Sequence, residues 1–215
     1  MAAASNATLA GAVRVLRAGG TVAFPTDTFY GLGVDALNAD AVKRVFNAKG
    51  RDEKRPLPLL IGGPDDALKV ARQFPENARR LAEKFWPGPL TIVLPSRQEV
   101  PGEVTAGAGG VGVRVPDHET PRLLVRMLGR PITGTSANKS GSPPHKDAAS
   151  VRADIGARVD MVLPGACGPH EAPSTVVDFT GPLPRVVRVG AISLSEVRKL
   201  VPEMVGPPAP QEATR

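Results

Sequence analysis

Residues 20–61 read GTVAFPTDTFYGLGVDALNADAVKRVFNAKGRDEKRPLPLLI, and we take the rest of the chain to be organised around them. The apolar run 21–24 predicts a strand that stops at Pro25 and leads into Thr26-Asp27-Thr28, which is rich in hydroxyl and carboxylate oxygen. Apolar residues at helical spacing then predict a helix that leads to Lys49-Gly50-Arg51. Hydroxyls at a strand end and two cations just past a helix suit a small polar substrate that carries phosphate, on loops held by a rigid scaffold.

The glycines of Tyr30-Gly31-Leu32-Gly33 are expected to let the backbone turn or approach a ligand closely. Outside this stretch, Thr8 is expected to cap a first helix that Gly19-Gly20 ends, and Asn38 or Asp40 to cap the helix that Gly50 closes. Residues 57–61 predict a short buried strand, which Pro58 places at an edge or a bulge. Further helices are expected at 65–74, 76–86, 121–128, 147–155 and 193–200, further strands at 90–94, 111–115, 131–135, 161–163, 174–179 and 184–189, and loops at 95–110 and 136–144.

This irregular alternation of helices and strands predicts a single domain with an α/β or α+β sheet of mixed strand directions. The 215 residues are enough for one well-buried core, and 41% hydrophobic and 22% charged residues are ordinary for a soluble globular protein. A single cysteine, Cys167, excludes an internal disulfide and any CxxC metal cage. No apolar run is long enough to span a membrane, and the N-terminus does not resemble a signal peptide, so a cytoplasmic location is expected.

The formal charge of +6 favours anionic partners such as nucleotides or RNA. No Walker A motif and no G-x-G-x-x-G sequence at a strand-to-helix turn are present, which argues against a standard P-loop or dinucleotide fold. The three histidines are widely spaced and predict no zinc site. Tyr30 and Trp86 are the only large amphipathic aromatics, whereas a single-strand RNA platform needs several stacking rings.

Residues 134–138, GTSAN, approach the G-x-S-x-G nucleophile elbow, but they end in Asn and have no identifiable partner histidine. We expect Thr135, Ser136 and Asn138 to form hydrogen bonds at a strand end, where open α/β sheets bind ligands. A loop turned by its own Ser and Asn side chains is the alternative.

Lys49 and Arg51 flank Gly50, where both could donate charge-assisted hydrogen bonds to a phosphate. Alternatively they complement the negative C-terminus of the helix, an effect of about 0.3–1 kcal/mol each. Arg114 lies inside an apolar strand and is expected either to point outward or to face an anion, because burying an unpaired cation is costly. Arg188, in VVRVG, raises the same question.

Six motifs in order give a specific resemblance: FPTDTFYGLG, then KGR with PLPLLI, WPGPLTIVL, VGVRVP, TSANKSG and PSTVVD. Together they resemble the YrdC family, in its short single-domain form, over residues 8–201. The resemblance implies a twisted open α/β fold of mixed strands with flanking helices around a large basic cavity. We expect a YrdC-like domain over residues 1–205 and a disordered tail at 206–215.

The resemblance also implies an activity, threonylcarbamoyl-AMP synthesis from L-threonine, bicarbonate and ATP, with pyrophosphate as the second product. The product would be handed to the enzyme that transfers threonylcarbamoyl to tRNA adenosine, and a weak contact with tRNA stays open. Mg²⁺ is expected to arrive with ATP, with no metal ligand from the protein. A non-catalytic RNA-binding module that uses the basic cavity is the alternative function.

Carried onto this chain, the family motifs assign roles to ten residues. Lys49, Arg51, Ser136 and Asn138 are implied as catalytic and ATP-binding residues, with Arg188 as a further ATP ligand. Thr26, Thr28, Arg114, Ser174 and Thr175 are implied as threonine-binding residues. Asp27 is a candidate general base on proximity alone, and the loop 165–173 departs from the family pattern. The central expectation is that Lys49, Arg51, Ser136 and Arg188 converge on one cavity.

Overall fold

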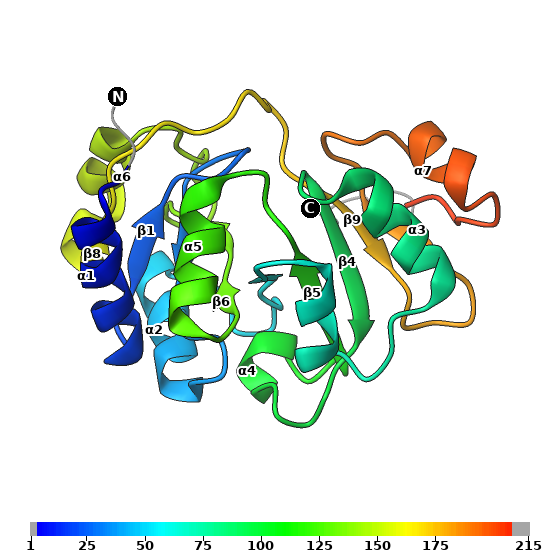
Figure 1. The fold of residues 1–215 in the computed structure, drawn as a ribbon, viewed down its shortest axis with the longest axis horizontal. Coiled ribbons are helices and arrows are strands. Elements are labelled where there is room, and N and C mark those ends of the chain that lie inside the picture. Colours follow the sequence, from blue (N-terminus) through cyan, green and yellow to red (C-terminus); the bar gives the residue numbers. More distant parts are fainter. Residues whose placement is uncertain (1–3, 208–215) are drawn as a thin grey trace, which may run out of the picture.

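The computed structural model describes residues 4–207 and shows an α/β fold with two mixed sheets and flanking helices (Figure 1). Of the tail expected at 206–215, residues 208–215 lie outside the described part. The helices are α1 Asn6–Arg17, α2 Ala39–Lys49, α3 Glu76–Phe85, α4 Gly102–Thr105, α5 Glu119–Leu128, α6 Ala148–Ile155 and α7 Leu194–Leu200, with short 3-10 helices at Pro64–Lys69 and Gly156–Arg158. The strands are β1 Val22–Phe24, β2 Gly31–Gly33, β3 Leu59–Leu60, β4 Leu90–Pro95, β5 Gly110–Arg114, β6 Ile132–Thr133, β7 Thr135–Ser136, β8 Met161–Val162, β9 Thr175–Asp178 and β10 Arg185–Arg188.

The two sheets hold the strands in the orders β7-β2-β1-β8 and β10-β9-β4-β5-β3-β6. In Figure 1, β1 lies to the left, and β4, β5 and β9 lie to the right beside α3 and α7. Both sheets mix parallel and antiparallel pairs, as β1 does with β8 and β2, and β4 with β9 and β5. The expected mixed strand directions are therefore confirmed, although they are divided between two sheets.

A single residue, Gly134, carries the chain from β6 in one sheet to β7 in the other. A Cβ at this position would lie 2.5 Å from Cγ of Leu60, so no larger residue fits without movement. The sheets consequently approach closely at this crossing. Ser136, expected at the start of a loop, instead lies in β7 and pairs with Gly31 of β2.

Helical faces bury the apolar residues that the periodicity identified. α1 packs on α5 through a cluster that includes Leu9, Leu16, Leu124 and Leu128. Asn38 caps α2 by accepting a hydrogen bond from the N–H of Ala41, and Gly50 ends it in the left-handed conformation at φ 59°. Trp86 is buried and donates its indole N–H to the Leu90 carbonyl. None of the described helices is both long and apolar enough to cross a membrane.

Four local expectations were wrong. Ser5, not Thr8, caps α1, because its hydroxyl accepts a hydrogen bond from the Thr8 N–H. The helix expected at 65–74 is only a 3-10 helix that ends at Lys69, and the loop expected at 95–110 contains α4. β3 is an interior strand paired with β5 and β6, because Pro58 precedes the paired residues and removes no donor from the ladder.

The glycines of β2 were expected in a turn or against a ligand, but they form a strand. Added Cβ atoms at Gly31 and Gly33 would lie 2.8 and 2.7 Å from ring atoms of Phe24 on β1. The two glycines therefore make room for the Phe24 ring, which is fully buried. Packing between neighbouring strands, rather than a special backbone conformation, requires glycine here.

We expect Gly33→Ala to lower the free energy of unfolding by about 1–3 kcal/mol, as overpacking of a filled core does. The new methyl group would lie 2.7 Å from the Phe24 ring and 2.9 Å from the Thr133 carbonyl oxygen. Chemical denaturation measures the change. Gly63→Ala is the matched control, since nothing lies within 4 Å of its added Cβ, and it is expected to stay within about 0.5 kcal/mol of the original chain. Equal stability of the two variants would contradict this account.

Candidate functional site

A cavity of about 440 Å³ is lined by residues from both sheets. Its floor is one face of the six-stranded sheet, because alternate residues of a strand point to the same face. This face carries Thr91 and Val93 of β4, Gly110 and Gly112 of β5, and Val176 of β9, while the intervening residues pack into the core. The wall opposite is formed by segments that belong to the first sheet or lie beside it: Thr26, Thr28–Gly31, Thr135, Ser136, Asn138 and Ser140–Ser142.

Five cations line the cavity, and no Asp or Glu of the described chain is among the lining residues. Lys49, Arg51, Ser136 and Arg188, expected to converge, all lie on this cavity. Arg55 and Arg114 are the other two basic residues that line the cavity. The cavity walls therefore present a concentration of positive charge and hydroxyl groups, which suits an anionic ligand.

Lys49 is the last residue of α2 and is almost fully buried, with 3% of its surface exposed. Its ammonium donates to the carbonyl oxygen of Ser136, to the carbonyl oxygen of Asn138 at 2.6 Å and to Asn138 Oδ1 at 3.4 Å. Burial, and next the positive charge of Arg51, lower the pKa of Lys49 to about 8. Lys49 thereby ties the end of α2 to the loop after β7, and its lowered pKa falls in the range of ordinary assay conditions.

Arg51 follows the left-handed turn at Gly50 and lines the cavity. Its Nε and Nη2 donate to the carbonyls of Arg55 and Pro56, which orient the guanidinium. Burial, and next the charge of Arg55, lower the pKa of Arg51. The helix-capping alternative does not account for this placement, because the side chain bonds the following loop instead of the end of α2.

Arg188 enters from β10, where its Nε and Nη2 donate to the carbonyl of Ser174 and its Nη2 also lies 3.2 Å from the Ser174 hydroxyl. Burial, and next the charge of Arg114, lower the pKa of Arg188. The Ser174 hydroxyl also lies 2.9 Å from the Thr91 hydroxyl. These contacts link β10, β9 and β4 across the floor of the cavity.

The Thr26-Asp27-Thr28 loop presents its two hydroxyls to the cavity, 3.1 Å apart. Thr26 Oγ1 accepts from the N–H of Thr28 and donates to the carbonyl of Phe29, so the loop closes on itself. Arg114 was expected either to point outward or to face an anion, and the second expectation is confirmed. It forms an ion pair with Asp27 at 2.5 Å.

Asn138 lines the cavity and its Nδ2 donates to the carbonyls of Lys139 and Ser142. Asn138 thus turns its own loop, as the loop alternative predicts, and it also lies at the cavity wall, where its role as a site residue stays a prediction. Thr175 is the one residue of the predicted set that does not line the cavity. It is fully buried, and its hydroxyl donates to the Ile192 carbonyl and accepts from the N–H groups of Gly190 and Ile192.

Sequence reasoning missed several residues of the cavity wall. Thr91 and Gly112 carry no local signal, because only the pairing of β4 with β5 brings them to the same face. Arg55 lies in residues 49–55, which also contain Lys49, Arg51 and Lys54, but none of the motifs gives it a role. Within the described residues no group of three His, Cys, Asp or Glu side chains could hold a metal ion.

The family model Sua5_yciO_yrdC, described as telomere recombination, matches residues 14–190. The chain belongs to this family. It is 41% identical over 189 residues to the threonylcarbamoyl-AMP synthase of Pyrococcus abyssi, and 36% identical over 190 residues to a putative threonylcarbamoyl-AMP synthase of Mycobacterium tuberculosis. Each alignment covers 88% of this chain. The aligned part is 56% of the P. abyssi protein and 87% of the M. tuberculosis protein.

Solved structures of the family share the fold. P. abyssi Sua5 complexed with L-threonine matches with a TM-score of 0.91 and 40% identity, over 95% of this chain and 60% of that one. E. coli YciO matches with a TM-score of 0.81 and 26% identity, over 90% and 94% of the two chains. The chain thus spans little more than half the length of the P. abyssi relative, and the resemblance to the YrdC family is confirmed.

Proposed function

We propose that the protein is a threonylcarbamoyl-AMP synthase, which joins L-threonine, bicarbonate and ATP and releases pyrophosphate. The observation that carries this proposal is one cavity in which Lys49, Arg51 and Arg188 meet the hydroxyls of the Thr26-Asp27-Thr28 loop. Relatives named for this activity, and one relative bound to L-threonine, support the choice of substrates. The tRNA-modifying context, the hand-off of the adenylate, weak tRNA contact and a cytoplasmic location are predictions that accompany it.

The cavity divides into two regions that suit the two larger substrates. Arg51 and Arg55 would bind the triphosphate, with Arg188 and Ser136 completing that region. Lys49, whose three N–H groups already donate to Ser136 and Asn138, would add its positive charge to the same region. Thr26, Thr28, Arg114 and Ser174 would bind the amino acid and its carbamate. Thr175 would act only indirectly, by bonding the backbone of the loop after β10, since its hydroxyl is fully used there.

The chemistry requires the neutral threonine amine to form a carbamate, either by adding carbon dioxide with loss of a proton or by condensing with bicarbonate with loss of water. A carbamate oxygen then attacks the α-phosphorus of ATP. The P–O bond to the β-phosphate breaks, and its electron pair leaves with pyrophosphate. Because a carbamate is already anionic, this second step needs alignment and charge neutralisation more than a strong base. Arg51 and Arg188 would stabilise the negative charge that gathers on the departing pyrophosphate.

Magnesium would enter the site with ATP, as part of the MgATP substrate. The described lining of the cavity offers no carboxylate, whereas Mg²⁺ sites usually combine phosphates with one or two carboxylates. We propose that the ion is held through the phosphates and water, without a ligand from the cavity wall.

The test is release of pyrophosphate from ATP by the purified protein, measured with and without threonine and bicarbonate. Release that depends on both is expected. Absence of release, or release unaffected by threonine, would contradict the proposal. The RNA-binding alternative predicts instead an RNA affinity with a steep salt dependence and no stabilisation by threonine plus ATP in a thermal-shift assay. No contact in the cavity favours that alternative.

A further inference from the structure

Asp27 has no role in the division of the cavity described above. It lies between two threonines whose hydroxyls line the cavity, yet it is not itself among the lining residues and only 2% of its surface is exposed. A buried carboxylate needs a partner. The partner of the Asp27 carboxylate therefore indicates how Asp27 contributes to the site.

Both carboxylate oxygens of Asp27 accept hydrogen bonds from Nη2 of Arg114 at 2.5 Å. Nε of Arg114 donates to the carbonyl of Gly88 at 2.9 Å. These bonds engage Nη2 and Nε of the guanidinium. Nη1 carries two further N–H groups, and among the described residues its single hydrogen-bonding contact is a long one of 3.5 Å to the hydroxyl of Thr28.

The loop backbone holds Asp27 in this position from the opposite side. The N–H of Gly168 donates to the carbonyl of Thr26 at 2.9 Å, and a Cβ at Gly168 would lie 2.7 Å from the Asp27 carbonyl oxygen. The segment that crosses from β8 to β9 thus packs directly on the loop backbone at Asp27. This contact and the bonds to Arg114 hold Asp27 from two sides.

We propose that Asp27 is a positioning residue that fixes Arg114, so that Nη1 and the Thr28 hydroxyl form a binding pair for a substrate carboxylate. This inference rests on the proposed function, in which that carboxylate belongs to threonine. It also removes Asp27 as a general base, since both of its oxygens face a guanidinium and neither faces the cavity. The charge of Arg114 is balanced by Asp27, which leaves Lys49, Arg51, Arg55 and Arg188 as the phosphate-attracting cations.

A double-mutant cycle of Asp27→Asn and Arg114→Gln tests whether Asp27 acts through Arg114. Threonine affinity is measured by calorimetry with L-threonine, and KM values for threonine and ATP by pyrophosphate release. We expect Asp27→Asn to weaken threonine binding about tenfold or more, as loss of a partner that orients a binding group does. We expect Asp27→Asn to change the KM for ATP less than about threefold. In the Arg114→Gln background, we expect Asp27→Asn to weaken threonine binding further by less than about twofold.

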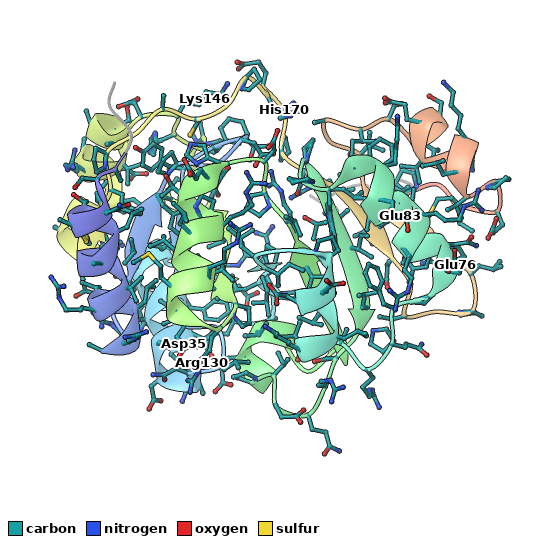
Figure 2. All side chains as sticks on the ribbon, in the orientation of Figure 1. Asp35, Glu76, Glu83, Arg130, Lys146 and His170 are labelled. Carbon is teal, nitrogen blue, oxygen red and sulfur yellow. The ribbon has the colours of Figure 1, made fainter. Side chains whose placement is uncertain are left out.

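The matched control is Asp35→Asn. Asp35 is also a buried carboxylate paired with an arginine, Arg130 at 3.0 Å, and neither residue lines the cavity. Figure 2 shows this pair at the lower edge of the molecule. We expect this variant to leave the affinity for threonine unchanged.

Breaking a buried ion pair is strongly destabilising, so a single variant that fails to fold is replaced by the double variant, which leaves no unpaired buried charge. The double variant is expected to keep kcat at saturating threonine within about tenfold, with an unshifted pH profile, while the threonine KM rises. A folded Asp27→Asn variant with unchanged threonine affinity would overturn the inference. A collapse of kcat together with loss of the decline at low pH in the pH–rate profile would also overturn it, because that result would mark Asp27 as a general base. If the original chain binds no threonine, the proposed function fails instead.

Discussion

Arg51→Ala is expected to lower kcat/KM for ATP by about 10²–10³-fold, the loss seen when one group that stabilises transition-state charge is removed. Arg51 lines the cavity, and the carbonyls of Arg55 and Pro56 orient it there, so its charge is preorganised for a triphosphate. Preorganised charge matters most where charge develops, which in this reaction is on the departing pyrophosphate. Pyrophosphate release at varied ATP concentration measures the effect.

Lys54→Ala is the matched control for Arg51→Ala. Lys54 belongs to the same basic segment but is exposed and does not line the cavity, and its removal is expected to change kcat/KM less than about twofold. Thermal unfolding of both variants should stay close to that of the original chain. If Arg51→Ala keeps full activity, or loses it only together with its fold, Arg51 does not serve the triphosphate.

The second large effect is on pH dependence. We expect kcat/KM for ATP to fall above about pH 8, tenfold for each pH unit, because this parameter reports the enzyme form that binds ATP and Lys49 loses its charge there. By pH 10 the loss is expected to reach about 100-fold. The measurement is initial rates of pyrophosphate release from pH 6.5 to 10 at saturating threonine.

This loss is separable from unfolding. The pKa of Lys49 is lower in the folded protein than its ordinary value of 10.5. From pH 8 to 10.5 the unfolded chain therefore binds the proton that the folded chain has released, and the Lys49 contribution to the free energy of unfolding rises with pH. Activity should thus fall while this contribution to stability increases. Lys49→Arg, which stays charged, is expected to remove the decline below pH 10, and a flat profile in the original chain would contradict the role of Lys49.

The sequence alone predicted most elements and the convergence of the site, because capping residues, alternation and ordered motifs carry those signals. Asn38 and Gly50 bound α2 as expected, and Lys49, Arg51, Ser136 and Arg188 share a cavity. Local rules could not show which face each residue takes in the folded sheet. Thr175 follows Ser174 directly, and alternation along β9 sends their side chains to opposite sides.

Pairing between distant strands also lies outside local rules. Gly31 and Gly33 carry the composition of a turn, and only the Phe24 ring on the neighbouring strand explains why they form β2. Asp27 and Arg114 were both singled out, but their ion pair joins segments that no pattern links. Pro58 indicated an edge strand because the sequence does not show that pairing begins only at Leu59.

The hydrogen bonds that build the cavity have a consequence for how the protein acquires its site during synthesis. Lys49 and Ser136 are 87 residues apart in the chain, Asp27 and Arg114 are also 87 apart, and Thr91 and Ser174 are 83 apart. Contacts of such long sequence separation form slowly, because a large loop must close before they can be made. A nascent chain that has not yet released Arg188 from the ribosome lacks the last lining residue, so the complete cavity forms only after nearly the whole domain has been synthesised.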